Sequence, residues 1–181
     1  LACLLFGVVA LMRPQARGLT EVASSNPTTA DVVFVLDVSK SMLADDTPPS
    51  RLVRAKAEIA QLAERLSHHR MGLVVFAGRA VPMCPLTPDH SFFTMVLGGV
   101  DPSSVSVGGT RIGEAVNVAV KAFPAGEGAK LIVLITDGED HESYPLEAAE
   151  KARDAGVKIV AIGLGSETGA PLSITDPQTG V

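Results

Sequence analysis

Five side chains with oxygen ligands stand in three separate segments of the chain. They are Asp37, Ser39, Ser41, Thr110 and Asp137. Carboxylate and hydroxyl oxygens are hard donors that suit Mg²⁺, and also Mn²⁺ or Ca²⁺. Because only two of the five side chains carry a negative charge, an ion held by them would stay electrophilic. These residue types therefore predict a divalent metal site, with Mg²⁺ as the first candidate.

The first three of these residues alternate along a single loop. In Asp37-Val38-Ser39-Lys40-Ser41 the oxygen-bearing side chains are separated by one residue each. Alternate side chains of an extended segment point the same way. The three oxygens can therefore turn toward one point while Val38 and Lys40 turn away from it.

Each segment also has a purely structural interpretation. Asp and Ser favour helix caps and turns, so the Asp37 loop could be a turn, Thr110 the N-cap of a helix and Asp137 a turn residue. The glycine-rich stretch 108–113 could instead cradle a phosphate, but no strand directly precedes it and it lacks the lysine of a P-loop. The combination of all three segments, in this order, favours the metal site.

Four further acidic residues follow these segments. Asp45 and Asp46 come after the first loop, and Glu139 and Asp140 come after Asp137. The first pair could support the ligands from behind or simply be exposed. The second pair could tune the rim of the site and touch a partner, or belong to a solvated acidic loop.

Apolar runs and helical periodicity indicate the elements that position these side chains. The run Val32–Leu36 is typical of a parallel strand that is covered on both faces, and Leu131–Thr136 and Val157–Ile162 resemble it. Ser50 is a plausible N-cap for an amphipathic helix. The expected helices cover residues 51–66, 91–97, 112–123 and 146–155.

Two short apolar runs, Gly72–Ala77 and Ala80–Leu86, predict a hairpin. Pro82 and Pro85 place its second strand at the edge of the sheet. The alternation of strands and helices around this hairpin predicts a doubly wound α/β fold. We expect a mostly parallel central sheet with one antiparallel edge strand and helices on both faces. Such sheets bind ligands at the carboxyl ends of their strands, near the switch in strand order.

Composition excludes several classes of function. The chain has 181 residues, 46% hydrophobic and 19% charged, which suits one folded domain with tails. Its net charge of -5 and the absence of a basic run make nucleic acid an unexpected partner. Two distant cysteines, Cys3 and Cys84, argue against a disulfide framework or a thiolate zinc site.

Three regions divide the chain. Residues 1–17 are interpreted as a truncated transmembrane helix with a basic flank, because an apolar run precedes Arg13 and a full span needs about 20 residues. A buried core helix is the alternative. The polar residues 18–30 form an expected linker, and residues 31–181 form the domain, with its C-terminal end expected to be incomplete.

The pattern Asp-x-Ser-x-Ser, Gly-Gly-Thr and Thr-Asp-Gly resembles the metal-ion-dependent adhesion site (MIDAS) of von Willebrand factor A domains. The resemblance covers about residues 31–165. It implies a Rossmann-like fold in which the hydroxyls of Ser39, Ser41 and Thr110 coordinate the metal, while Asp37 and Asp137 act directly or through water. It also implies that an acidic residue of a partner protein completes the coordination.

A narrower resemblance links the chain to the Bat proteins, a membrane-anchored bacterial group associated with aerotolerance. It rests on Leu-Met-Arg-Pro-Gln, on Asp-Val-Ser-Lys-Ser-Met-Leu-Ala-Asp-Asp, and on Gly-Leu-Val-Val-Phe-Ala-Gly with Pro-Leu-Thr-Pro-Asp. The resemblance implies a location in the bacterial inner membrane. It also implies partnership with other Bat-type proteins and with a MoxR-type AAA+ ATPase.

Two other classes of function remain open at this stage. The chain could be a structural subunit of a membrane complex whose metal site does not work. It could also be a Mg²⁺-dependent phosphatase-like enzyme that uses Asp37. Such phosphatases carry a second Asp where this chain has Ser39, so we expect no enzyme.

Overall fold

The computed structural model describes residues 29–126, 128–138, 140 and 143–165. Strands and helices alternate along this part of the chain, as the apolar runs predict. In chain order the elements are β1 (Asp31–Asp37), η1 (Lys40–Leu43), α2 (Arg51–Arg65), β2 (Arg70–Phe76), β3 (Ala80–Thr87), α3 (His90–Gly98), η2 (Pro102–Ser104), α4 (Ile112–Lys121), β4 (Lys130–Thr136), α5 (Pro145–Asp154) and β5 (Val157–Gly163).

The strands form one sheet in the order β3-β2-β1-β4-β5. Neighbouring strands are parallel except β3, which pairs antiparallel with β2 at the edge. The predicted fold class and the position of the proline-containing strand are thus confirmed. The chain builds outward from β1 to β3 and then crosses back to β4, so the strand order switches between β1 and β4.

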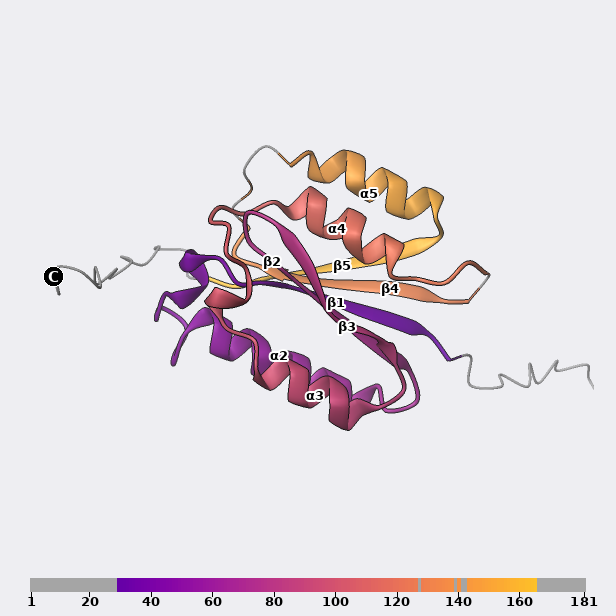
Figure 1. Ribbon diagram of the computed structural model, residues 1–181, viewed down its shortest axis with the longest axis horizontal. Helices are drawn as coiled ribbons and strands as arrows, with labels where there is room; N and C mark the ends of the chain where they lie inside the picture. The colour runs from indigo at the N-terminus through magenta and orange to yellow at the C-terminus, as the bar shows by residue number, and fades with distance from the viewer. Residues whose placement is uncertain (1–28, 127, 139, 141–142, 166–181) are drawn as a thin grey trace, which may run out of the picture.

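Two layers of helices enclose the sheet (Figure 1). Helices α2 and α3 cover one face, and α4 and α5 cover the other. Every residue of β1 is buried, because the strand lies at the centre of the sheet and both of its faces are covered. Phe34 packs with Phe93 toward α3, and Val33 and Val35 point to the opposite core. This double burial explains the uninterrupted apolar run.

Helix α2 begins where its sequence predicts. The Ser50 hydroxyl accepts a hydrogen bond from the Val53 amide at 3.3 Å, which satisfies one of the free donors of the first turn. Leu52, Ala55 and Ile59 then recur on the buried face and anchor the helix on the sheet.

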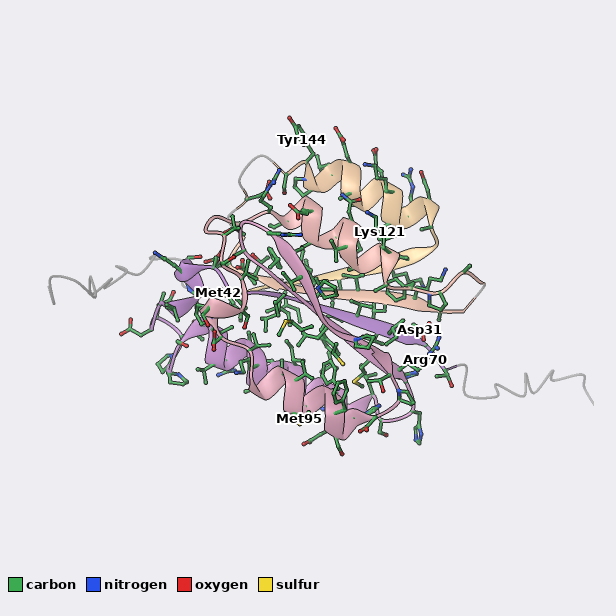
Figure 2. The ribbon with its side chains drawn as sticks, viewed as in Figure 1. Asp31, Met42, Arg70, Met95, Lys121 and Tyr144 are labelled. Atoms are coloured by element: carbon green, nitrogen blue, oxygen red, sulfur yellow. The ribbon has the colours of Figure 1, made fainter. Side chains whose placement is uncertain are left out.

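The two ends of the sheet differ in character. Figure 2 shows Met42 at the end where the parallel strands finish, and Asp31 with Arg70 at the opposite end. Met42 is fully buried beneath the loop after β1, so that loop is fixed to the core. Asp31 and Arg70 form an ion pair with Nε to Oδ1 at 2.7 Å.

The predicted transmembrane helix 1–17, residues 18–28 of the linker and the last residues of the domain lie outside the described residues. Within the ranges that the structure describes, no helix has the length and hydropathy required to cross a bilayer.

Candidate metal centre

The three predicted segments meet at the carboxyl ends of β1, β2 and β4. Asp37 ends β1, and Asp137 directly follows β4, the strand beside it. The loop after β1 and the loop before α4 are both tied to the end of β2. The Val38 amide donates to the Phe76 carbonyl at 2.8 Å, and the Arg111 amide donates to the Ala77 carbonyl at 2.9 Å. Ser39 and Thr110 each stand one residue from these bonds. The loops therefore converge at the switch in strand order, where such sheets bind ligands.

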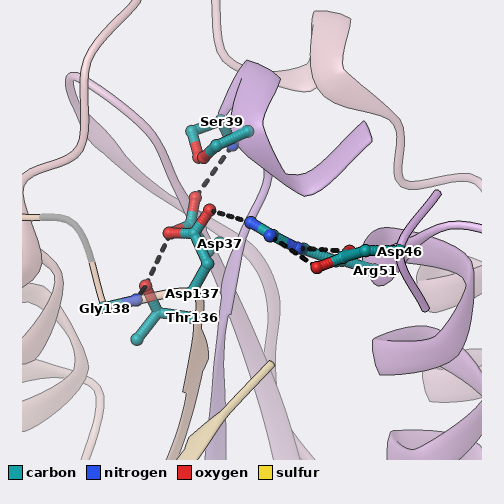
Figure 3. A network of polar contacts seen from close by, with 8 residues as sticks. Asp37, Ser39, Asp46, Arg51, Thr136, Asp137 and Gly138 are labelled. Atoms are coloured by element: carbon teal, nitrogen blue, oxygen red, sulfur yellow. Dashed lines mark hydrogen bonds and ion pairs between the residues drawn. The ribbon is translucent and has the colours of Figure 1, made fainter. Parts of the chain in front are cut away.

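Asp37 is the most deeply buried member of the set, with no exposed surface. Its Oδ1 accepts a hydrogen bond from the Ser39 amide at 2.8 Å, and its Oδ2 accepts one from the Thr136 hydroxyl at 2.7 Å. Figure 3 shows both bonds, which fix the carboxylate between the ends of β1 and β4. Thr136 was not among the predicted site residues, although it belongs to the Thr-Asp-Gly pattern.

Burial raises the pKa of Asp37 above its ordinary value. The hydrogen bonds from Ser39 and Thr136 oppose this rise, because they stabilise the ionised carboxylate. The negative charge of Asp137 acts in the same direction as burial. A positive charge placed among these groups would relieve both the desolvation of Asp37 and its repulsion by Asp137.

Ser39 and Ser41 bring their hydroxyls together. Their Oγ atoms lie 2.9 Å apart, and both residues are buried. The turn that does this is the start of η1, where the Met42 amide donates to the Ser39 carbonyl at 3.0 Å. Neighbouring oxygens around an octahedral Mg²⁺ are about 2.9 Å apart when each metal bond measures 2.0–2.1 Å. The hydroxyl pair therefore fits adjacent ligand positions of such an ion.

Thr110 is 2% exposed, although the four residues before it are exposed. The preceding stretch contacts the turn after β2: the Gly78 amide donates to the Val107 carbonyl at 3.0 Å, and a Cβ on Gly78 would stand 2.0 Å from the Gly108 carbonyl oxygen. Gly109 adopts a φ of 101°. This conformation favours glycine, and it turns the chain into the buried Thr110.

The interpretation of Thr110 as a helix cap is wrong. The N-cap of α4 is Arg111, whose side chain makes no capping bond. The free amides of the helix are instead bonded by the loop after β4: Ile112 donates to Asp140 Oδ1 at 2.9 Å, and Gly113 donates to the Ser143 hydroxyl at 2.7 Å. Asp140 thus joins two loops of the site, and Ser143 is a supporting residue that the sequence analysis missed.

Asp137 contacts a cation that the sequence analysis also missed. Arg51 Nη1 donates to Asp137 Oδ2 at 3.1 Å. Its Nε and Nη2 donate to Asp46 Oδ1 and Oδ2, each at 2.8 Å. Asp46 therefore lies near the site and acts on it through Arg51, whereas Asp45 is exposed. Glu139 lies outside the described residues.

A signal for Arg51 was present in the sequence. Arg51 is the first residue of α2, directly after the predicted N-cap Ser50. A cation in the first turn is opposed by the helix dipole, so an arginine there requires compensation from nearby anions. Asp45 and Asp46, which precede Arg51 by a few positions, were the candidates for this compensating anion.

The donor set decides which ions the site suits. Within the described ranges, no three His, Cys, Asp or Glu side chains are grouped to hold a metal. A site here depends on hydroxyl oxygens as well as on the two carboxylates. Such ligands fit a hard ion that retains water molecules, as Mg²⁺ does, better than a thiolate or imidazole zinc site.

Two solved bacterial structures are similar to this chain. The conserved hypothetical protein BatB from Bacteroides thetaiotaomicron is 40% identical with a TM-score of 0.78, and the alignment covers 84% of this chain and 74% of BatB. An aerotolerance-related membrane protein from Bacteroides fragilis is 40% identical with a TM-score of 0.76, covering 80% and 72%. The narrower resemblance to the Bat group is confirmed.

More distant relatives share the domain. Proximal thread matrix protein 1 from the mussel byssus, solved with a zinc-occupied MIDAS motif, is 28% identical with a TM-score of 0.67, covering 76% of this chain and 36% of that protein. A UPF0353 protein of Mycolicibacterium paratuberculosis is 32% identical over 152 residues, covering 77% of this chain. The chain spans about half, 46%, of that relative's length. Residues 31–177 match the von Willebrand factor type A domain, and the chain belongs to that family.

Proposed function

We propose that this domain binds a divalent cation, Mg²⁺ in the first place and Mn²⁺ or Ca²⁺ as alternatives, and uses it to grip an acidic side chain of a partner protein. Ser39, Ser41 and Thr110 would supply hydroxyl ligands. Asp37 and Asp137 would supply negative charge, directly or through water. When bound, the ion provides a Lewis-acidic position for the partner's carboxylate.

The convergence of the three loops that carry these residues, at the switch in strand order, supports the proposal. Asp37 is held by two hydrogen bonds at 2.7 and 2.8 Å, so its position is fixed before any ligand arrives. The paired hydroxyls of Ser39 and Ser41 have the spacing of neighbouring octahedral ligands. The mussel protein with an occupied MIDAS motif supports a metal site in this family, although its ion is zinc.

Apolar side chains beside these loops support a protein as the partner. Leu43, in η1, is 51% exposed, and Val107, before the Thr110 loop, is 47% exposed. An exposed apolar residue by itself is common, but these two flank the loops that present the site. An acidic side chain of the partner would coordinate the metal, and apolar residues around it would bury Leu43 and Val107.

The bacterial relatives suggest where the domain works. The similarity to an aerotolerance-related membrane protein supports attachment to the bacterial inner membrane, through the segment 1–17. We propose that the partners include other Bat-type proteins and a MoxR-type AAA+ ATPase. Metal-dependent contact would make such an assembly reversible.

Asp37 is poorly placed to act as the nucleophile or base of an enzyme. The position two residues on is Ser39, where phosphatases of this kind carry a second Asp, so that acid–base partner is missing there. We therefore propose binding and not catalysis. A structural subunit with a non-functional metal site is the second candidate, because the Arg51 guanidinium already supplies a cation beside Asp137.

The test of the metal site is a thermal melting series. The domain from residue 18 onward is melted in EDTA and in increasing Mg²⁺ or Mn²⁺, with Asp37→Ala as the control. At about a hundredfold excess over Kd, a site present only in the folded state adds roughly 2.7 kcal/mol to the free energy of unfolding. A saturable rise in Tm that the variant lacks is expected. No rise at millimolar ion would favour the structural subunit.

The partner is sought in a second experiment. Ser39→Ala should keep the fold and lose metal-dependent capture of the candidate partners. Its melting temperature in EDTA, matched to that of the wild type, verifies the fold. Capture that is equally strong in EDTA and in Mg²⁺ would contradict the proposed mode of recognition.

A further inference from the structure

One guanidinium joins two carboxylates beside the candidate metal centre. Arg51 binds Asp46 through two hydrogen bonds of 2.8 Å and binds Asp137 through a third of 3.1 Å (Figure 3). The side chains of Arg51, Asp46 and Asp137 are 12%, 6% and 2% exposed. These ion pairs are therefore largely shielded from water, unlike exposed surface pairs, which contribute little to stability.

The fork geometry explains why arginine occupies this position. Its planar guanidinium can satisfy both oxygens of Asp46 and still direct Nη1 at Asp137, which a lysine ammonium cannot do with the same rigidity. Asp46 fixes the guanidinium, and the hydrogen bond to Asp46 raises the pKa of Arg51. Asp46 thereby offsets the unfavourable first-turn position of the cation on α2.

The charges around the site make the role of this cation specific. Asp37 and Asp137 repel each other, and Asp46 adds a third carboxylate nearby. Arg51 supplies one positive charge in contact with two of these three groups. The same charge that relieves repulsion in the metal-free site must repel a divalent cation that binds at Asp137.

We propose that Arg51 is an internal counter-cation that stabilises the metal-free site and lowers its affinity for the divalent ion. Arg51 is a positioning residue, since it acts on the ion through Asp137 and through its charge. The proposal rests on the metal binding proposed above. It predicts that the ion can leave and bind again without unfolding the site, because Arg51 keeps the loops in place when the ion is absent.

A competing role for Arg51 predicts the opposite change in metal affinity when the residue is removed. If Arg51 served mainly to orient Asp137 for the metal, its removal would weaken metal binding. If its charge dominates, its removal tightens metal binding and destabilises the metal-free protein. Even at the dielectric constant of water, a unit charge about 6 Å from a doubly charged ion changes the affinity on the order of tenfold, and the lower effective dielectric constant of a partly buried site increases the effect.

The experiment compares Arg51→Gln with Arg54→Gln in the full chain. Arg54 lies one turn along the same helix and pairs with Glu58 at 2.8 Å, but both of these side chains are about half exposed. Melting is measured in EDTA, and Mg²⁺ and Mn²⁺ binding is measured by calorimetry. For Arg51→Gln we expect a Tm in EDTA lowered by at least about 5 °C, because Asp46 and Asp137 lose the positive charge that both of them contact, and metal binding at least on the order of tenfold tighter.

Arg54→Gln should change neither the Tm in EDTA nor the affinity for Mg²⁺ and Mn²⁺. Unchanged or weaker metal binding in Arg51→Gln, or an unchanged Tm in EDTA, would overturn the proposal. If that variant folds only with metal, the proposal is supported. If it does not fold at all, Arg51→Lys decides: because lysine keeps the positive charge, its metal affinity should equal that of the wild type, and weaker metal binding would show that Arg51 mainly orients Asp137 and would refute the role.

The two proposals fail in different ways. If neither the wild type nor Arg51→Gln responds to metal, the metal site itself is refuted. If both respond with equal affinity, metal binding stands and only the role of Arg51 is refuted.

Discussion

Gly113→Ala is a substitution for which two physical effects predict opposite outcomes. Gly113 lies in the first turn of α4, where alanine is favoured over glycine by about 1 kcal/mol in helix propensity. A Cβ at this position, however, would stand 1.9 Å from the carbonyl oxygen of Ser143, far inside the 3.4 Å at which ordinary contact begins. Backbone atoms block the space, so no side-chain rotation relieves the overlap.

The structure indicates that the overlap wins. Overpacking costs about 1–3 kcal/mol. The loop carrying Ser143 and Asp140 must also move away from α4, which endangers two hydrogen bonds worth about 1 kcal/mol each: Gly113 to Ser143 and Ile112 to Asp140. Against the gain in propensity, the free energy of unfolding should fall by about 2–4 kcal/mol.

The assay is urea denaturation in EDTA, with Gly98→Ala as the matched control. Gly98 is the last residue of α3, and a Cβ there meets nothing within 4 Å. Gly98→Ala should therefore be neutral or slightly stabilising. If Gly113→Ala is as stable as the wild type, the close approach of α4 to the loop after β4 is not what holds the site together.

Further predictions concern the two ends of the sheet. Asp37→Asn should raise the free energy of unfolding in EDTA at pH 7 and abolish the metal-induced Tm shift, because it removes a buried charge that the fold disfavours. Since folding raises the pKa of Asp37, the protonated carboxyl contributes to the stability of the wild type below the ordinary value of 3.8. This contribution is lost as pH rises from 3.8 through the folded value. The advantage of Asp37→Asn, followed by urea denaturation across pH, should therefore vanish in acid; an advantage that persists there would contradict the assignment. Arg70→Met leaves the Asp31 carboxylate, 7% exposed, without its partner and should cost about 1–3 kcal/mol by the same assay. Its Mg²⁺-induced Tm shift should equal that of the wild type, and a reduced shift would show coupling along β1.

Much of the fold follows from local sequence. Strands β1 and β4 are continuous apolar runs because both of their faces are covered, and Ser50 marks the start of α2 by bonding the Val53 amide. Pro82 and Pro85 predict an edge strand because proline cannot donate to a second neighbour. These signals lie within a few residues of the structure that they determine.

The support of the site was harder to predict because its bonds join distant segments. Asp140 and Ser143 bond the amides of Ile112 and Gly113, which lie 28 and 30 residues earlier. Local sequence also allowed Thr110 as the cap of α4, an alternative that the structure rules out because the N-cap is Arg111. Arg51 meets Asp137 across 86 residues, and only the unfavourable placement of a cation at a helix start hinted at a partner.

The crossing from the β1 side of the sheet to β4 has a kinetic consequence. Thr136 bonds Asp37 across 99 residues of sequence, so the centre is complete only after both central strands have paired. Pairing of parallel strands at such separation forms slowly, because loop closure precedes the contacts that reward it. An ion bound at such a late-formed point cannot nucleate folding. If an ion binds there as proposed, it would act by slowing unfolding, so that the lifetime of the folded domain would depend on the local ion concentration.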